Sequence, residues 1–249
     1  MSIEYAAAGG VARITLNRPE KRNAITGEMM SALREAFERA AGDSTVRVLL
    51  IRGAGKDFCA GLDLSEVLKS AEDADAALAS ARKLGDLYIA MRRHPKPIVA
   101  AVQGRALGGG AGIATASDLI IAAESAQLGY PEVNLGFIPA IVATMLRRAV
   151  NERQAMELAL TGEPIRAARA YAVGLINRVV ADAEFDAEVE RYVSMLAEKS
   201  ASAMSLSKKL LCETDAMSFE ASIEAGVQAN VQVRATDDFK RGVERFLKK

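Results

Sequence analysis

Five short runs along the chain carry the hydrophobic spacing of β-strands. Val11–Leu16 alternates apolar and polar residues, which is the period of a strand with one buried face. The other four are rich in β-branched and other apolar residues, as in strands with little contact with water. They are Val46–Ile51, the run between Pro97 and Gly104, Leu119–Ala122 and Ile176–Val180. We expect these strands to form the centre of the protein.

Apolar residues at helical spacing dominate the segments between the strands. Thr26 is suited to cap a helix whose apolar face would carry Met29, Met30, Leu33, Ala36, Phe37 and Ala40. An alanine-rich helix is expected over Ala71–Arg93, with Leu78, Leu84, Leu87, Tyr88 and Met91 on its apolar side. Further helical patterns cover Ile141–Ala149, Arg153–Leu160, Ile165–Ala172 and the chain from Phe185 to the end.

The alternation of strands and helices ends after about 180 residues. Up to that point it predicts an α/β layered core, because strands separated by helices form sheets with helices packed on their faces. We therefore expect an α/β core over residues 1–184 and a helical region over residues 185–249.

Composition and charge exclude several classes of protein. Half of the 249 residues are hydrophobic, which is enough for one large core. Lys plus Arg and Asp plus Glu each number 32, so no nucleic-acid-binding surface is expected. The start of the sequence does not resemble a secretion signal, and no run is long and apolar enough to span a membrane. We expect a cytoplasmic protein without a membrane span.

The chain has few residues for metal or nucleophilic chemistry. Its only cysteines, Cys59 and Cys212, stand far apart, which argues for a reducing compartment and against disulfide or zinc chemistry. His94 is the only histidine, so no metal site is expected. Pro95 follows it at an expected helix end, where we expect His94 to be a partner of the helix dipole rather than a catalyst.

Gly108, Gly109 and Gly110 stand where a helix is expected to begin after the strand that starts at Pro97. A glycine inside an element costs roughly 0.5–1 kcal/mol relative to alanine, so this turn needs bare backbone for another reason. Two nucleotide-binding motifs fail, since Ile113 stands at the last position of a dinucleotide fingerprint and Gly110 at the lysine of a P-loop. Two interpretations stay open: backbone N–H groups that hold a small anion or oxyanion, and a helix packed tightly on a sheet.

Two other loops carry candidate chemistry. Residues 53–64 contain Gly53, Gly55 and Gly61 after a strand, which indicates special backbone angles or close approach. In residues 128–139 a lone carboxylate, Glu132, stands among apolar residues, glycines and prolines. Such surroundings raise a carboxyl pKa and suit it to proton exchange near neutral pH. The alternative is that Glu132 only occupies the first turn of a short helix after Pro131.

Together these loops resemble the crotonase superfamily, the enoyl-CoA hydratase/isomerase family. The similarity extends over nearly the whole chain, and the segments that carry it are Asn17–Ala24, Phe58–Leu64, Gly104–Gly112, Tyr130–Gly136 and Ala170–Val180. The resemblance implies a spiral of ββα units with a C-terminal helical region that serves as a trimerisation or lid element. It also implies a homotrimer or dimer of trimers that binds acyl-coenzyme A thioesters.

The resemblance also assigns residues by position. The backbone N–H groups of Leu62 and Gly109 would hold the thioester oxygen, as an oxyanion hole does, and Glu132 would be the catalytic acid or base. The residues that would contact coenzyme A or the substrate are Arg22, Lys56, Ala60, Gly61, Asp63, Gly108 and Lys249, the last in a neighbouring subunit. No separate cofactor is implied, because coenzyme A arrives as part of the substrate. Leu68, Tyr88, Phe137 and Ile138 are candidates for the acyl pocket.

One departure from the family pattern bears on the reaction. Hydratases of this family resemble one another in having two glutamates; Glu132 matches the second, but Gly112 stands at the first. Addition of water needs a base and an acid, whereas moving a double bond needs one group that carries a proton between two carbons. We therefore favour isomerisation of 3-enoyl-CoA to 2-enoyl-CoA by Glu132. A hydratase with Asp63, Glu66 or another carboxylate as the second acid, a binding protein without turnover, and other reactions of the family stay open.

Overall fold

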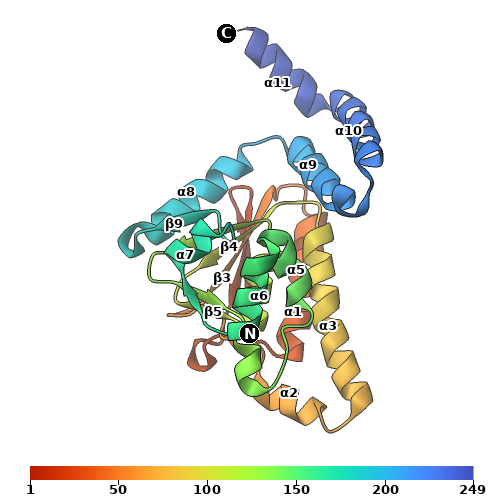
Figure 1. Cartoon of the computed structure of the whole chain (residues 1–249). Coiled ribbons are helices and arrows are strands. Elements are labelled where there is room, and N and C mark those ends of the chain that lie inside the picture. Colours follow the sequence, from red (N-terminus) through yellow and green to blue (C-terminus); the bar gives the residue numbers. More distant parts are fainter. Residues whose placement is uncertain (249) are drawn as a thin grey trace.

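A six-stranded sheet forms the centre of the protein in the computed structural model, which describes residues 1–248 (Figure 1). The strand order is β1-β2-β3-β4-β6-β9, in which β1 is antiparallel to β2 and every other neighbouring pair is parallel. The strands span Ile3–Ala8 (β1), Val11–Leu16 (β2), Val48–Gly53 (β3), Ile98–Val102 (β4), Leu119–Ala123 (β6) and Arg178–Val180 (β9). The five strands predicted from hydrophobic spacing are all present here.

A second, three-stranded sheet lies beside the loops of interest. It consists of β5 (Arg105–Leu107), β7 (Gln127–Gly129) and β8 (Ile165–Arg166), with β7 parallel to β5 and antiparallel to β8. An isolated bridge between Cys59 and Ala106 connects the loop after β3 to β5. This bridge holds that loop beside the helix that follows β5.

Helices connect the strands and form the C-terminal quarter of the chain. They span Gly27–Gly42 (α1), Leu64–Ser70 (α2), Ala74–Arg93 (α3), Gly109–Ala116 (α4), Val142–Ala149 (α5), Glu152–Thr161 (α6), Ala167–Ala172 (α7), Phe185–Ala197 (α8), Ala201–Glu213 (α9), Phe219–Arg234 (α10) and Asp237–Leu247 (α11). Short 3₁₀ helices span Pro19–Lys21 (η1), Pro131–Leu135 (η2), Asp182–Glu184 (η3) and Thr214–Ala216 (η4). The α/β class and the helical C-terminal region are as predicted.

Helices α1 and α3 show how far apolar spacing predicts packing. The Thr26 side chain caps α1 by accepting a hydrogen bond from the Met29 N–H, and all six predicted apolar positions of α1 are buried. In α3 the predicted face is buried from Leu84 onward. Leu78 is an exception: it is 51% exposed, because the first turns of α3 extend beyond the core.

Other elements differ from the sequence-based expectation. The helix predicted over residues 165–172 begins only at Ala167, because Ile165 and Arg166 pair with β7 instead. The strands β1, β5 and β7 and the helix α2 were not predicted. In β1 only Ile3 is buried, and β5 and β7 have three residues each, so their hydrophobic signal is weak.

The C-terminal helices leave the body of the protein step by step. Helix α8 packs on the main sheet, and Phe185, Val189 and Val193 are buried in the same core as the strands. Helices α10 and α11 protrude from the rest of the chain (Figure 1). The division at residue 184 and the trimerisation or lid role of residues 185–249 stay predictions. In residues 1–248 no helix is long and apolar enough to cross a bilayer.

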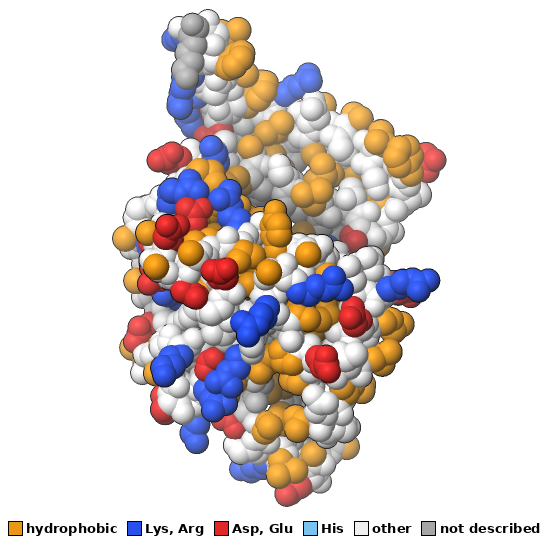
Figure 2. Space-filling model, turned by 60° about the vertical axis from the view of Figure 1, so that its left-hand side comes forward, with side chains coloured by type: hydrophobic (Ala, Val, Ile, Leu, Met, Phe, Trp, Pro, Cys, Tyr) orange, Lys and Arg blue, Asp and Glu red, His pale blue; other side chains and the backbone are white. Residues whose placement is uncertain are grey.

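An apolar face of α10 and α11 is exposed. Figure 2 shows hydrophobic side chains gathered on the protruding part, at the top of that view. The exposed residues on these helices are Phe219, Ile223, Val227, Val231, Phe239, Val243, Phe246 and Leu247. On α10 they recur every four residues, which places them along one side of the helix.

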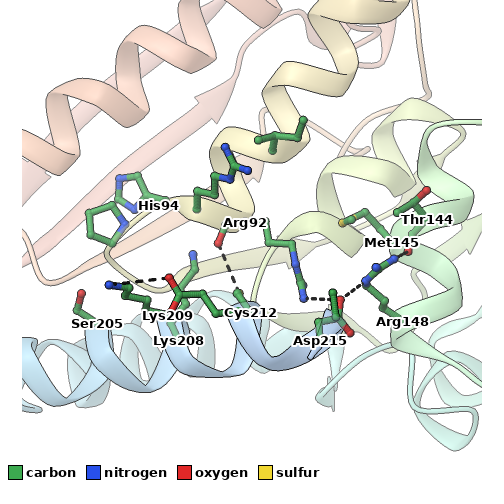
Figure 3. A pocket seen from close by; sticks show the side chains of 15 residues that line it. Arg92, His94, Thr144, Met145, Arg148, Ser205, Lys208, Lys209, Cys212 and Asp215 are labelled. Atoms are coloured by element: carbon green, nitrogen blue, oxygen red, sulfur yellow. Dashed lines mark hydrogen bonds and ion pairs between the residues drawn. The ribbon is translucent and has the colours of Figure 1, made fainter. Parts of the chain in front are cut away.

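Helix α9 is held to the body by polar contacts. Lys208 is a buried residue whose Nζ lies 2.7 Å from Oδ2 of Asp118 and donates to the Met91 carbonyl at 3.0 Å. Burial raises the pKa of the Asp118 carboxyl even though Lys208 lowers it. Figure 3 shows a second contact, in which Arg92 and Arg148 both approach Asp215.

His94 ends α3 near the same contacts but is not a charged partner of the helix dipole. Its ring nitrogens have hydrogen-bond partners at the Phe37 carbonyl, 3.1 Å away, and at the Lys96 backbone. Burial lowers the pKa of the imidazole, so the ring is uncharged at neutral pH. The expectation that His94 is a partner of the helix dipole is therefore wrong, because the ring is buried and carries no charge to interact with the dipole.

The buried ion pair predicts an asymmetric response to two neighbouring substitutions. Lys208→Ala leaves Asp118 as an uncompensated charge, so we expect it to lower the free energy of unfolding by about 3 kcal/mol. Lys209→Ala removes an exposed pair with Glu213 and should cost at most about 0.5 kcal/mol. Urea denaturation at one fixed protein concentration compares the two, and equal losses would contradict the anchoring role of Lys208.

Candidate active site

The candidate site depends on close packing between the loop after β3 and the start of α4. Gly110 of α4 lies against Cys59, and a Cβ atom added to Gly110 would come within 2.4 Å of the Cys59 carbonyl oxygen. The same loop pairs with β5 through hydrogen bonds from Cys59 N–H to the Arg105 carbonyl and from Leu107 N–H to the Cys59 carbonyl, both 2.9 Å. Only a glycine at residue 110 permits this approach. The helix is therefore packed tightly, as one interpretation of the glycine cluster expected, but against a loop rather than a sheet.

The same packing brings the backbones of Leu62 and Gly109 together. A Cβ atom added to Gly109 would lie 3.6 Å from the Leu62 nitrogen, and one added to Gly61 would lie 3.9 Å from the Gly109 nitrogen. Within residues 1–248, neither N–H donates a hydrogen bond to the protein. Ile25 pairs with the peptide groups on both sides of Leu62 and leaves its N–H out, while Gly109 is the first residue of α4. Two neighbouring donors are thus available to an acceptor.

Glu132 lies beside these two donors. It belongs to η2, which begins at Pro131, and its Oε1 would be 3.2 Å from a Cβ atom on Gly108. Its Oε2 is buried without a hydrogen-bond partner in the described chain. Burial raises the pKa of this carboxyl above its ordinary value of 4.5. Glu132 thus stands in the first turn of a short helix, as one interpretation expected, and has the raised pKa that the other expected, while its role in proton exchange stays a prediction.

Two cavities meet at Leu62, Gly109 and Glu132. The first has a volume of about 320 Å³ and is mostly apolar. Its other lining residues come from α2, α3 and the segment after η2: Val67, Ser70, Ala71, Ala77, Ser80, Ala81, Leu84, Tyr88, Phe137, Ile138, Pro139, Ala140, Ile141 and Val142. Three of the four predicted pocket residues, Tyr88, Phe137 and Ile138, line this cavity, and Leu68 does not. It is 72% exposed, because α2 turns Val67 inward instead.

The second cavity, of about 740 Å³, carries most of the predicted coenzyme A contacts. Those among its lining residues are Arg22, Ala60, Gly61, Asp63 and Gly108. Lys56 is exposed and lines neither cavity, and Lys249 lies outside the described residues. Among residues 1–248, the structure therefore brings together every predicted site residue except Lys56.

The candidate second acids are engaged elsewhere. Asp63 caps α2 and pairs with Arg18 at 3.3 Å, and hydrogen bonds from Ser65 lower the pKa of its carboxyl. Glu66 accepts a hydrogen bond from the Gly27 N–H at 2.8 Å and is exposed. A lowered pKa opposes the uptake of a proton, so Asp63 is a poor general acid near neutral pH.

Two residues that position the polar cavity were given no role from the sequence. Arg18 joins Asp63 to the Ala24 carbonyl, to which it donates at 2.8 Å. Asn23 is fully buried and donates to the carbonyls of Ala54 and Asp57 at 2.9 and 2.8 Å. The local feature that marks Asn23 is its positive backbone φ of 56°, and this angle cannot be read from a sequence.

The buried carboxyl of Glu132 predicts a pH dependence of stability. Because its pKa is raised on folding, the folded protein keeps this proton at pH values where the unfolded chain releases it. The free energy of unfolding of wild type should therefore fall relative to Glu132→Gln as pH rises from about 4, and then level off above the raised pKa. Thermal unfolding across pH measures this difference.

Asp63→Asn provides a control of opposite sign. The pKa of Asp63 is lowered on folding, so wild type should gain stability over Asp63→Asn as pH rises through the acid range. A Glu132→Gln difference that is constant with pH, or that follows the Asp63 trend, would contradict the assignment of a raised pKa to Glu132.

Comparison with known proteins agrees with this geometry. A family model described as enoyl-CoA hydratase/isomerase matches residues 6–249. The 1,2-epoxyphenylacetyl-CoA isomerase of Escherichia coli K12 is 34% identical over 245 residues, covering 96% of this chain and 93% of that protein. The 2,3-dehydroadipyl-CoA hydratase of the same organism is 33% identical over 238 residues, covering 95% and 91%.

Solved structures agree as well. The crystal structure of an enoyl-CoA hydratase of Mycobacterium smegmatis has a TM-score of 0.95 at 30% identity, covering 100% of this chain and 96% of that one. The agreement includes the α/β sheet core and the helical C-terminal region. Sequence and fold lead to the same assignment: this chain belongs to the enoyl-CoA hydratase/isomerase family.

Proposed function

We propose that the protein isomerises 3-enoyl-CoA thioesters to 2-enoyl-CoA thioesters, with Glu132 as the group that carries the proton. The observation that supports this most strongly is the junction of the two cavities. There a single carboxyl with a raised pKa stands beside two backbone N–H groups that have no protein partner in residues 1–248. This combination supplies what a one-base proton transfer requires.

In the proposed reaction, Glu132 removes a proton from C2 of the substrate. The electrons of that C–H bond form a double bond between C1 and C2, and the carbonyl π electrons move to the thioester oxygen, to which the N–H groups of Leu62 and Gly109 donate. When C4 is protonated, the oxygen re-forms the carbonyl, the C1–C2 pair becomes the C2–C3 double bond, and the C3–C4 pair bonds the proton. Each such donor is typically worth about 10²–10³ in rate. Glu132 then returns the proton to C4, so the reaction is balanced without water or a second acid.

The engagement of the two candidate second acids in other contacts separates this proposal from hydration. Addition of water requires one group to activate the water and another to protonate C2. Asp63 and Glu66 are held by hydrogen bonds outside the junction, and Gly112 has no side chain. The names of the two relatives include an isomerase and a hydratase. The reaction is therefore inferred from the site and not from the names.

The polar cavity is the proposed place of the coenzyme A moiety. Lys21 and Arg22 in its wall supply positive charge suited to phosphates, and Ala60 and Gly61 expose backbone between that wall and the junction. The apolar cavity then receives the acyl chain. Coenzyme A is thus part of the substrate, and the proposal includes no separate cofactor. A cytoplasmic location and a role for Lys56 or Lys249 in binding stay predictions.

We also propose that the chain assembles with copies of itself, as a trimer or a dimer of trimers. The supporting observation is the apolar face of α10 and α11, defined above, which protrudes from the body and is exposed in the single chain. Contiguous exposed apolar surface of this kind is typical of interaction sites.

Turnover assays with purified protein test the proposed reaction. We expect 3-enoyl-CoA to be converted to 2-enoyl-CoA, followed by ultraviolet absorbance, and 2-enoyl-CoA to be hydrated far more slowly. Glu132→Gln should lower kcat by at least about 100-fold, because the group that carries the proton is lost. Binding of coenzyme A, measured by calorimetry, should change little.

Glu66→Gln is the matched control, since it removes a neighbouring carboxylate that is exposed. It should leave kcat for isomerisation within about twofold of wild type, because it removes no group that contacts the substrate in the proposed reaction. Hydration of 2-enoyl-CoA that is as fast as isomerisation, and that Glu66→Gln or Asp63→Asn abolishes, would establish the hydratase alternative. Binding of both thioesters without turnover would establish a binding protein.

The exposed face of α10 predicts an effect on assembly. Val231→Glu places a charge on the apolar face, where Val231 is 61% exposed, and should shift the protein from oligomer to monomer in sedimentation velocity experiments. Gln228→Glu adds the same charge at an exposed polar position of α10 and should leave the oligomer intact. A wild-type monomer at micromolar concentration, or equal dissociation by both variants, would refute the proposed assembly.

A further inference from the structure

The space beside Gly112 is filled by a side chain from another helix. A Cβ atom added to Gly112 would lie 1.9 Å from the hydroxyl oxygen and 2.6 Å from Cζ of Tyr88, which belongs to α3. Tyr88 is only 2% exposed and lines the apolar cavity beside Gly109 and Glu132. The tyrosine ring can therefore occupy this place only because residue 112 is a glycine.

The Tyr88 hydroxyl has one hydrogen-bond partner, and it belongs to the proposed oxyanion site. It donates to the Gly109 carbonyl oxygen at 3.0 Å. Burial raises the pKa of the phenol well above its ordinary value, with smaller effects of Cys59, Tyr130 and Glu132 in the same direction. The phenol is therefore a neutral hydrogen-bond donor at neutral pH.

The first turn of α4 needs such a contact because its backbone has little intrinsic rigidity. Gly108, Gly109, Gly110 and Gly112 lack the Cβ atoms that restrict backbone angles, and Gly108 has a φ of 51°. The hydrogen bond from Gly112 N–H to the Gly108 carbonyl closes the turn, and Gly108 N–H connects its start to β7 by donating to the Gly129 carbonyl at 2.9 Å. The contact of Tyr88 connects Gly109 to α3, a helix of 20 residues packed on the core.

We propose that Tyr88 is a positioning residue, which holds Gly109 so that its backbone N–H points to the thioester oxygen. The proposal rests on the proposed function in that it assigns the same N–H group to the substrate. Tyr88 takes no proton and touches no reacting atom in this scheme. It acts through Gly109, and Gly112 is the glycine that makes room for it.

Tyr88→Phe tests the proposal, because it removes the hydroxyl and keeps the ring in the cavity. We expect kcat for 3-enoyl-CoA to fall about tenfold, since a small displacement of an oriented donor is costly in rate. KM should change by less than about twofold, because the volume of the acyl cavity is preserved. A purely structural hydroxyl would lower the melting temperature without this split between kcat and KM.

Tyr130→Phe is the matched control. Tyr130 is also fully buried, and its hydroxyl forms a 2.7 Å hydrogen bond with Thr115 on the same helix α4, away from Gly109. It should show a comparable fall in melting temperature with kcat within twofold of wild type. Wild-type kcat in Tyr88→Phe, or an equal loss of kcat in both variants, would overturn the proposal.

Gly112→Ala provides a second test that leaves Tyr88 in the sequence. Its Cβ atom would displace the hydroxyl, so kcat should again fall about tenfold. In the double variant Tyr88→Phe with Gly112→Ala, the combined loss should be smaller than the product of the single losses, because both act through one contact. Losses that multiply would contradict a shared contact.

A second readout separates the proposal from the reaction on which it rests. Exchange of C2 protons of a saturated acyl-CoA in deuterium oxide, followed by NMR, requires enolate formation but no double bond. If wild type exchanges these protons without isomerising 3-enoyl-CoA, the proposed function fails, and the exchange rates of Tyr88→Phe and Tyr130→Phe decide the role of Tyr88. A tenfold slower exchange in Tyr88→Phe alone would uphold it, and equal rates would refute it.

Discussion

The contact between Gly110 and the Cys59 carbonyl is the constraint on which the candidate site depends. Two backbone segments, separated by about 50 residues in the sequence, come so close there that no side chain fits between them. Leu62 lies three residues after Cys59, and Gly109 directly precedes Gly110. The contact therefore makes Leu62 and Gly109 neighbours as well. Their N–H groups remain unpaired within residues 1–248 because both segments have already formed their other hydrogen bonds. A pair of hydrogen-bond donors that can bind an oxygen is thus a consequence of packing, and no polar side chain is needed to form it.

The carboxyl at this junction shows how stability is exchanged for chemistry. A buried oxygen without a partner is costly, and most buried polar groups avoid this situation. For Glu132 the cost appears as a raised pKa, and the raised pKa is also what makes the group an effective carrier of protons. Asp63, the residue after Leu62, has a lowered pKa instead, because Ser65 and Arg18 stabilise its charge. The difference between the two carboxyls is that burial dominates at Glu132, whereas hydrogen bonds dominate at Asp63.

Sequence patterns predicted the large elements and the loops that meet, but not the contacts that decide their roles. Hydrophobic spacing was sufficient for the central strands and for α1, because burial of one face is a property of a single segment. It failed for Leu78, where the first turns of α3 extend beyond the core. The predictions for Leu68 in the pocket and for His94 at the helix end also failed, since the direction of one side chain and the burial of the other depend on tertiary packing. The association of Leu62, Gly109 and Glu132 was accessible only through the resemblance to a family. Three segments far apart in the chain have no local signal that they converge.

Gly112 illustrates why the residue at a position does not by itself define a site. From the sequence it is an absent carboxylate, and the natural conclusion is that something has been lost. In the fold it is the place where Tyr88 fits, and the helix turn that carries Gly109 is linked to α3 as a result. A carboxylate at residue 112 and the tyrosine ring at this place exclude each other, because they need the same volume. The glycines of α4 thus have different partners, Cys59 for one and Tyr88 for another, and the single acid at residue 132 belongs to a site that is packed around it.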